Sequence, residues 1–424
     1  MNPGDQLSFN MDEGALTSDV VQLRDGFERA KLTLHWASEA VICCDSQGRY
    51  WSAYPLHLSH MEEIRAHFDH LRLVLRVEER DPPDNAVTWI VDHDVSVEPL
   101  PFFNGVGGFI KALPVLVRRL YLAAAEADAL VVRLPGPIGS LHAFFCWLRG
   151  IPYTAHMVGD PNQVLSSKGF RWHERLLRQP LVALSRFVCS RAVACAYVTE
   201  RQLQSLYPPR KGVPSVAISN VLLEPRHFVD RPRIEPVGNS AMLAFCGSLA
   251  QEYKGLDILL AALRELTSAG FDVYLTVMGD GAFRAEYETQ ASRLGMTERV
   301  QFCGNVPPEA VLEQFRSSDL FVMPSRTEGL PRAMIEAMAQ ALPCIGTNVG
   351  GIPELLDETA LVPIDDSHAL ANCIERFLRD RQLFAAQSER NLRRSRDFET
   401  SLISERRFQF YSWLSKAAHR RKAS

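Results

Sequence analysis

Short apolar runs alternate with amphipathic stretches from residue 241 onward, and this alternation constrains the fold more than any other feature of the 424-residue chain. Uninterrupted apolar strands are typical of parallel sheets covered on both faces, and the amphipathic stretches between them supply crossover helices. The pattern predicts a doubly wound α/β domain that binds its ligand at the carboxyl ends of its strands. The predicted strands are 241–247, 273–279, 300–304, 320–325 and 343–348.

The N-terminal half predicts a second α/β unit, in keeping with a length that exceeds what one hydrophobic core usually supports. Its strand-like runs are 39–44, 71–77, 88–94, 129–134, 153–159 and 194–200. Between the halves, a segment rich in proline and charge lacks an apolar period, as linkers do. The predicted organisation is an N-terminal domain, a linker, a C-terminal domain and a final helix that returns to the first domain, at 1–223, 224–240, 241–400 and 401–424.

The amino-acid composition of the chain argues against several kinds of binding partner. The formal net charge is -4, so no overall positive field would gather nucleic acid. The nine cysteines lack the paired spacing of metal sites, and no apolar run is long enough to span a bilayer. These features predict a cytoplasmic protein with reduced thiols.

One segment suggests a peripheral contact with a membrane. Residues 168–191 mix aromatic and Leu side chains with Lys168 and several arginines. A basic amphipathic helix of this kind can lie on the anionic inner face of a membrane. The alternative is a helix that packs its apolar stripe on the N-terminal sheet and leaves a solvated basic face.

Residues 324–339 carry the most informative chemistry. They comprise a strand end, a turn with glycine, and a helix for which Pro331 suits the first position. Glu336 falls on the second helical turn among apolar residues, where a carboxylate needs donors such as vicinal ribose hydroxyls. Glu328, in the turn, can face the same cleft and bind another polyhydroxylated group. The alternative is that Glu336 pairs with a basic side chain and that Glu328 is a surface turn residue.

This stretch resembles the signature of the retaining glycosyltransferases of family 4, in which two Glu separated by seven residues follow an apolar strand ending in Pro-Ser. Glu328 and Glu336 match it residue by residue, and further similarity covers 247–263, 277–281, 302–325 and 349–356. The resemblance extends over roughly 241–380, while the N-terminal half matches only loosely. The resemblance implies the GT-B architecture, with two Rossmann-like doubly wound α/β domains facing across a cleft. It also implies that Glu336 binds the nucleotide ribose and that Glu328 contacts the transferred sugar.

The implied activity is transfer of a hexose from a nucleotide diphosphate sugar to a hydroxyl of a glycan or lipid-linked precursor, with retention of configuration. UDP or GDP is the expected nucleotide, and no metal is required. The resemblance assigns catalytic roles to Glu328, Lys254 and Asp160, the last of which follows the strand 153–159. The donor-binding set that it implies is Glu336, Gly247, Ser248, Gly279, Gly304, Asn305, Val306, Gly329, Leu330 and Arg332.

Two positions depart from the family pattern. Ser248 stands where an arginine commonly helps to neutralise the donor diphosphate, and Pro331 replaces the second glycine of the turn. A diphosphate leaving group needs positive charge or N–H donors as its charge develops. Lys254 and the N-terminus of the helix that starts near Pro331 could supply both. Arg326 and Arg332 are candidate replacements for the missing arginine.

Three alternatives stay open. Asp92, His93 and Asp94 form a DxD after an apolar run, the pattern with which metal-dependent GT-A glycosyltransferases hold a divalent ion. The same fold could carry a nucleotide-sugar epimerase, which would convert the donor without an acceptor. The departures at Ser248 and Pro331 also fit a non-catalytic subunit that binds a nucleotide sugar or a glycan.

Overall fold

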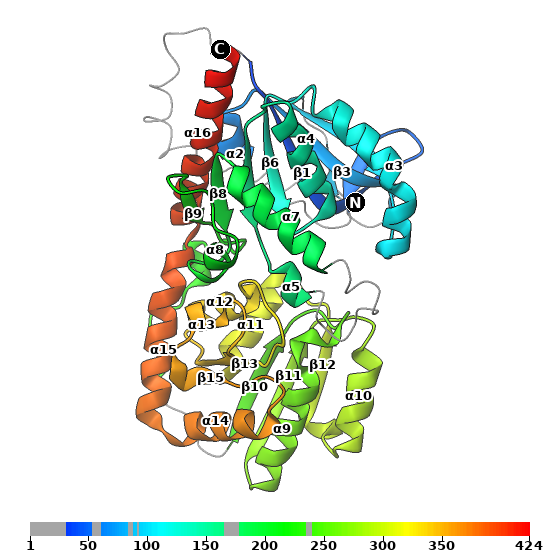
Figure 1. Cartoon of the computed structure of the whole chain (residues 1–424). Coiled ribbons are helices and arrows are strands. Elements are labelled where there is room, and N and C mark those ends of the chain that lie inside the picture. Colours follow the sequence, from blue (N-terminus) through cyan, green and yellow to red (C-terminus); the bar gives the residue numbers. More distant parts are fainter. Residues whose placement is uncertain (1–30, 53–60, 84–87, 91–92, 165–177, 235–239) are drawn as a thin grey trace, which may run out of the picture. The chain divides into compact units, whose positions relative to one another are not determined.

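The computed structural model describes residues 31–52, 61–83, 88–90, 93–164, 178–234 and 240–424. Within them, Leu32–Ser424 forms one compact unit with two sheets, each covered by helices (Figure 1). Parts of several predictions lie outside the described residues: 91–92 of the predicted strand 88–94, which include Asp92, 168–177 of the basic segment, and 235–239 of the linker.

The N-terminal sheet is built around β1 (Thr33–Cys44), which pairs in parallel with β3 (His70–Glu79) and β6 (Ala129–Leu134). The described strands follow the order β4-β2-β1-β6-β7-β8-β9, and β3 also pairs with β5. β1 starts before the predicted strand because polar side chains interrupt its first half. The other strands are β2 (Tyr50–Ser52), β4 (Thr88–Trp89), β5 (Val95–Pro101), β7 (Tyr153–Met157), β8 (Ala194–Tyr197) and β9 (Ser215–Ala217).

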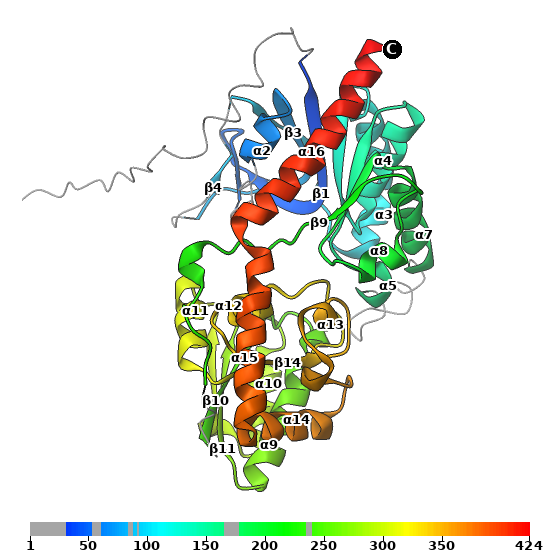
Figure 2. The ribbon, with the colours of Figure 1, turned by 90° about the vertical axis from the view of Figure 1, so that its left-hand side faces the viewer.

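Helices cover both faces of this sheet (Figures 1 and 2). On one face, α3 (Gly105–Ala123), α4 (Pro137–Leu148) and α7 (Arg178–Arg191) bury apolar side chains against the sheet. On the other face, α2 (Met61–Arg65) and the last helix α16 (Thr400–Ala423) do the same. The described part of the basic segment, α7, therefore packs on the sheet. The short helices α5 (Pro161–Val164) and α8 (Gln202–Leu206) follow β7 and β8.

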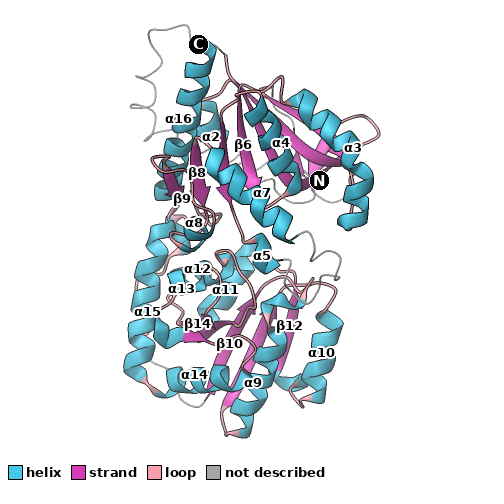
Figure 3. Cartoon of the chain, in the orientation of Figure 1, coloured by secondary structure: helices cyan, strands magenta, loops and turns pink. Residues whose placement is uncertain are grey.

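The C-terminal sheet is parallel, with the order β12-β11-β10-β13-β14-β15 (Figure 3). All five predicted strands are present, as β10 (Ser240–Cys246), β11 (Asp272–Met278), β12 (Val300–Gly304), β13 (Leu320–Met323) and β14 (Cys344–Thr347). The edge strand β15 (Leu361–Val362) is too short to leave a sequence pattern. The helices are α9 (Leu256–Ser268), α10 (Arg284–Arg293), α11 (Pro308–Ser317), α12 (Arg332–Ala339), α13 (Ile352–Leu355), α14 (Ser367–Arg379) and α15 (Arg381–Ser395).

The strand order places the candidate site. β10 and β13 are neighbours, with Leu243 opposite Leu320, so the loops after these two strands meet at one edge of the sheet. One loop carries Lys254 and the other carries Glu328, which the chain separates by 74 positions. Because the two strands are parallel, the loops that follow them lie at the same carboxyl edge of the sheet, and Lys254 and Glu328 come together there.

Two further observations concern the whole described chain. The nine cysteines are free thiols, in line with the predicted reduced state. Among the described residues, no helix combines the length and the apolar character needed to cross a bilayer.

Candidate active site

Glu328 lies in the turn between β13 and α12, where two groups hold its carboxylate. Its Oε1 accepts a bond of 2.5 Å from Lys254 Nζ and one of 2.9 Å from Ser325 Oγ. Both charged side chains are largely buried, with exposed fractions of 12% for Lys254 and 8% for Glu328. Burial is the largest single influence and would lower the pKa of Lys254, but the charge and hydrogen bond of Glu328, together with Tyr253 and Cys246, raise that pKa above its ordinary value. Lys254 is therefore a cation at neutral pH.

The loop that carries Lys254 is fixed against the strand end that precedes Glu328. Lys254 ends a 3-10 turn (Glu252–Lys254), and Gly255 follows with a φ of 70°. A Cβ on Gly255 would lie 2.0 Å from the Pro324 carbonyl oxygen, so only glycine allows this approach. The backbone N–H of Arg326 also donates to the Tyr253 carbonyl at 2.7 Å.

Arg326 does not have a free guanidinium for a diphosphate. Its Nη2 lies 2.6 Å from Asp257 Oδ2, and its Nε lies 2.6 Å from Asp365 Oδ1. Two carboxylates therefore neutralise it, and its role in the fold is to tie the turn to α9. Of the two candidate replacements for the missing arginine, Arg332 is the more accessible, since its side chain is 52% exposed.

A cavity of about 390 Å³ lies next to Glu328. It brings together three of the predicted site residues, Asp160, Glu328 and Gly329. No sequence motif pointed to the rest of its lining, although each of these residues follows a strand or adjoins a predicted site residue. They are Pro135, Val158, Gly159, Gln251, Tyr253 and Thr327.

Asp160 is a buried carboxylate at this cavity, just after β7. It accepts a bond of 2.5 Å from the Tyr207 hydroxyl and one of 2.9 Å from the Asn162 N–H. Burial and the charge of Asp160 raise the pKa of Tyr207, so the phenol stays protonated and donates. Tyr207 lies 47 positions away in the chain, and no local pattern pointed to it.

Glu336 lies one helical turn beyond Arg332 on α12, which begins at Arg332 rather than at the predicted Pro331 because the backbone of Pro331 is extended. The nearest oxygen of Glu336 is 3.7 Å from Arg332 Nη2, too long for a strong hydrogen bond. Burial raises the pKa of Glu336, while the charges of Arg332 and His227 oppose this. Its oxygens therefore retain capacity to accept bonds from a ligand.

The predicted glycines hold neighbouring loops together at the carboxyl edge of the sheet. Gly279 donates to the Gly304 carbonyl at 2.8 Å, and Gly247 donates to the Met278 carbonyl at 2.9 Å. A Cβ on Gly279 would lie 1.9 Å from the Gly247 carbonyl oxygen. Close backbone packing thus accounts for Gly279.

The remaining predicted residues lie around these loops. Ser248 and Asn305 are exposed, Val306 packs at the border of the C-terminal core, and Leu330 packs against the cores of both sheets. A Cβ on Gly329 would lie 2.5 Å from the Val158 carbonyl oxygen, so the turn after Glu328 directly contacts the loop after β7.

The alternative metal motif is only partly described. Asp94 forms an ion pair with Arg65, with 2.7 Å between Asp94 Oδ2 and Arg65 Nε. Among the residues that the structure describes, no group of three or more His, Cys, Asp or Glu is arranged to hold a metal ion.

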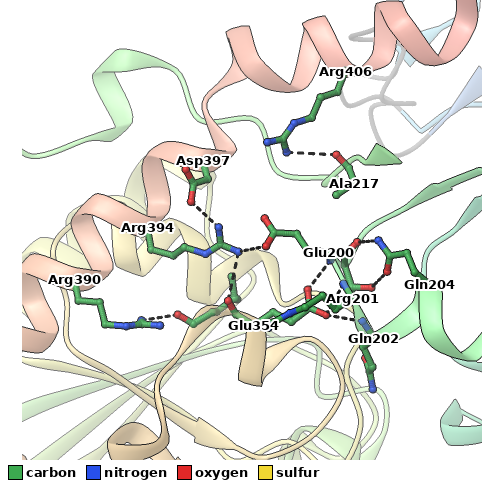
Figure 4. Close-up of polar contacts among 12 residues, drawn as sticks. Glu200, Arg201, Gln202, Gln204, Ala217, Glu354, Arg390, Arg394, Asp397 and Arg406 are labelled. Carbon is green, nitrogen blue, oxygen red and sulfur yellow. Dashed lines mark hydrogen bonds and ion pairs between the residues drawn. The ribbon is translucent and has the colours of Figure 1, made fainter. Parts of the chain in front are cut away.

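Glu354 joins the two halves of the chain, as Figure 4 shows. Its carboxylate accepts backbone N–H bonds from Glu200 at 2.5 Å, Arg201 at 3.1 Å and Gln202 at 2.7 Å, at the start of α8. Next to it, Arg394 of α15 lies 2.9 Å from the Glu200 carboxylate. A carboxylate that accepts N–H bonds at a helix start is a strong, charge-assisted arrangement. No pattern in the sequence predicts this contact.

We expect Glu354→Ala to lower the free energy of unfolding by about 2 kcal/mol, because three backbone donors lose a charged acceptor. Denaturant unfolding followed by circular dichroism would measure the loss. Glu358→Ala is the matched control, since Glu358 is a nearby exposed carboxylate. Equal stability of the two variants would show that the Glu354 contact contributes little.

Comparisons with known proteins show which family and which fold the chain resembles. Residues 240–380 match the family model described as Glycosyl transferases group 1. Protein CapJ of Staphylococcus aureus is 26% identical over 264 residues, which cover 62% of this chain and 66% of CapJ. The first curated relatives are covered over only 44% to 66% of their own lengths, less than two thirds.

Solved structures show the same fold at low sequence identity. Sucrose-phosphate synthase from Thermosynechococcus elongatus superimposes with a TM-score of 0.68 at 18% identity, over 91% of this chain and all of that one. Anabaena HepE in complex with UDP and glucose gives a TM-score of 0.63 at 18% identity, with coverage of 91% and 100%. These similarities confirm the predicted α/β class and the two Rossmann-like domains of the GT-B architecture.

Proposed function

We propose that the protein transfers a hexose from a nucleotide diphosphate sugar to a hydroxyl acceptor with retention of configuration, since residues 240–380 match the family model of glycosyl transferases group 1. The observation that carries the proposal is the buried Lys254–Glu328 pair beside a cavity that also contains Asp160. This site lies at the carboxyl edge of the C-terminal sheet, where doubly wound domains bind nucleotides.

The arrangement suits a reaction whose difficulty is the departure of an anionic diphosphate. In the proposed complex, the Lys254 ammonium faces the diphosphate and stabilises the charge that develops on it. Glu328 then exchanges part of its contact with Lys254 for hydroxyls of the transferred sugar. Asp160, held by Tyr207, contacts the same sugar from the other side of the cavity. Arg332 supplies the positive charge that Ser248 lacks.

Retention follows in this proposal from a front-face reaction, in which the leaving phosphate helps to deprotonate the acceptor hydroxyl. Fixed groups that orient donor and acceptor then supply most of the rate enhancement. No protein nucleophile is assigned, and no metal has a role. The family match favours transfer over the epimerase and binding-subunit alternatives.

The donor nucleotide in this proposal is UDP or GDP, and the Anabaena HepE complex, which contains UDP, supports UDP by analogy of fold. Glu336 is assigned to the ribose hydroxyls because burial leaves its carboxylate in need of donors. The proposed acceptor is a glycan or a lipid-linked glycoconjugate precursor. A cytoplasmic location with peripheral contact at the inner membrane face completes the proposal.

Thermal unfolding in the presence of UDP or GDP tests the donor site. A ligand that binds only the native state adds about 2.7 kcal/mol at one hundred times its dissociation constant. We expect one of the two nucleotides to raise the midpoint by several degrees and Glu336→Ala to abolish the shift. Glu313→Ala, on the neighbouring helix α11, is the control that should keep it. A shift that persists in Glu336→Ala would refute the assignment of Glu336, and the absence of a shift with both UDP and GDP would refute the proposed donor site.

A further inference from the structure

The helices α3 and α4 expose large apolar side chains to solvent. Ile110 is 60% exposed, Leu122 is 53% exposed and Leu148 is 57% exposed. Side chains of this size are normally buried, and several together on one face mark an interaction surface. The other exposed members of this set are Val115, Val117, Tyr121 and Trp147.

On the exposed face of α3, an apolar stripe runs along the helix and basic side chains lie beside it. Ile110, Val117 and Tyr121 follow helical spacing and therefore form one stripe along the helix. Lys111 and Arg118 lie beside this stripe and are also exposed. The opposite face of α3 buries Leu116 and Leu120 against the sheet, so the exposed stripe is not needed for the fold.

The charged side chains of α3, α4 and α7 are all basic. The sequences of α3, α4 and α7 contain no Asp or Glu, although the whole chain has a formal net charge of -4. The three helices lie side by side on one face of the N-terminal sheet (Figure 1). The basic residues that they and their ends carry include Lys111, Arg118, Arg119, Arg149, Arg186 and Arg191.

Aromatic rings and arginines connect the three helices. The ring centroids of Trp147 and Phe187 are 5.2 Å apart, which joins α4 to α7. The Arg149 guanidinium lies 4.3 Å from the Tyr121 ring centroid, and that of Arg191 lies 5.6 Å from the Trp147 ring. Rings with an apolar body and a polar edge are typical of the boundary between water and lipid.

We infer that this surface, formed by α3, α4 and α7, docks on an anionic phospholipid bilayer. The apolar side chains require hydrocarbon, and the unbalanced cations require negative headgroups; a bilayer offers both at the same depth. A symmetric dimer through this face is a poorer partner, because it would place the same cations of two copies against each other. The inference rests on the proposed function only in placing the protein at the inner membrane face, and it names the surface that would make this contact.

Vesicle binding of the full chain tests the inference. Co-sedimentation uses vesicles of phosphatidylcholine alone and of phosphatidylcholine with phosphatidylglycerol. We expect wild type to bind the anionic vesicles, and Lys111→Glu/Arg118→Glu to bind them about tenfold more weakly or worse. Arg264→Glu/Arg293→Glu changes the net charge equally on α9 and α10 and should bind like wild type. Ile110→Ser/Leu122→Ser tests the apolar part, with Ile364→Ser as its control.

The outcomes separate this inference from the proposed function. Nucleotide-dependent thermal shifts should be unchanged in all of these variants, which also shows that they fold. Wild type that binds nucleotide but no anionic vesicle would overturn the docking surface and leave the donor site intact. Equal loss of binding in the two charge-reversal variants would overturn it as well, since net charge alone would then explain it. Light scattering that shows a dimer dissociated by Ile110→Ser/Leu122→Ser, with vesicle binding unaffected, would assign the face to a second copy instead.

Discussion

Replacing Lys254 with methionine is expected to lower kcat/KM for sugar transfer by about 10² to 10³-fold, the usual effect of removing a group that stabilises developing negative charge. Lys254 Nζ is 2.5 Å from Glu328 Oε1 in a largely buried pair. The substitution therefore removes the cation proposed for the diphosphate and also leaves the Glu328 carboxylate without its strongest partner. Steady-state kinetics with saturating acceptor would measure the loss.

A double-mutant cycle with Glu328→Gln separates catalysis from general damage. If the two residues act as one unit, the double variant should lose little more activity than either single variant. Lys211→Met, which removes an exposed lysine, is the control. A Lys254→Met enzyme within threefold of the control would refute the proposed role of this lysine.

The second large effect is expected from Gly279→Ala, which should cost more than about 3 kcal/mol of folding free energy or prevent folding. Gly279 has a φ of 140°, and its added Cβ would lie 1.9 Å from the Gly247 carbonyl oxygen. Moving the loop at Gly279 would break its bond to the Gly304 carbonyl, and moving the loop at Gly247 would break the bond from Gly247 to the Met278 carbonyl. Chemical denaturation would measure the change.

Comparison with Gly295→Ala separates the steric clash at position 279 from the cost of placing alanine in a conformation with positive φ. Gly295 also has a positive φ, of 69°, but a Cβ there would have no atom within 4 Å. It should cost only about 1 to 2 kcal/mol, the usual penalty for alanine in a left-handed conformation. If the two variants were equally stable, the contact between the loops would not be the reason for glycine at 279.

The alternating pattern predicted the C-terminal strands well because each is an apolar run buried on both faces. It was less successful in the N-terminal half. There β1 contains His35, which faces His142 at 3.2 Å inside the core. Burial, and after it the proximity of His142 and Arg72, lowers the pKa of His35 to about 2, so the ring is neutral and occupies a buried strand position that an apolar residue would normally fill. A pattern that only distinguishes apolar from polar residues cannot recognise a polar side chain that is buried in its neutral form.

The residues of the candidate site were likewise only partly predictable from the sequence. Glu328 and Lys254 were proposed from the sequence because they match the family 4 motifs. The structure shows that the two side chains meet because the strands that precede them, β10 and β13, are parallel neighbours. The partners that complete the site were not identified. Tyr207 on Asp160 and the two carboxylates on Arg326 come from distant segments. Whether Arg326 was available for a diphosphate could be decided only by these contacts.

The sequence by itself therefore determined the α/β class and the position of the carboxyl edge, because local periodicity dictates which faces are buried and parallel strands align their ends. It proposed Glu328 and Lys254 only through the motifs that they share with the family 4 glycosyltransferases. Only the tertiary structure decided which charges are already neutralised, which glycines serve packing, and that Glu354 binds the backbone of residues 200–202. Ion pairs and close backbone approaches form between side chains far apart in the chain, and their geometry leaves no periodic signal in the sequence.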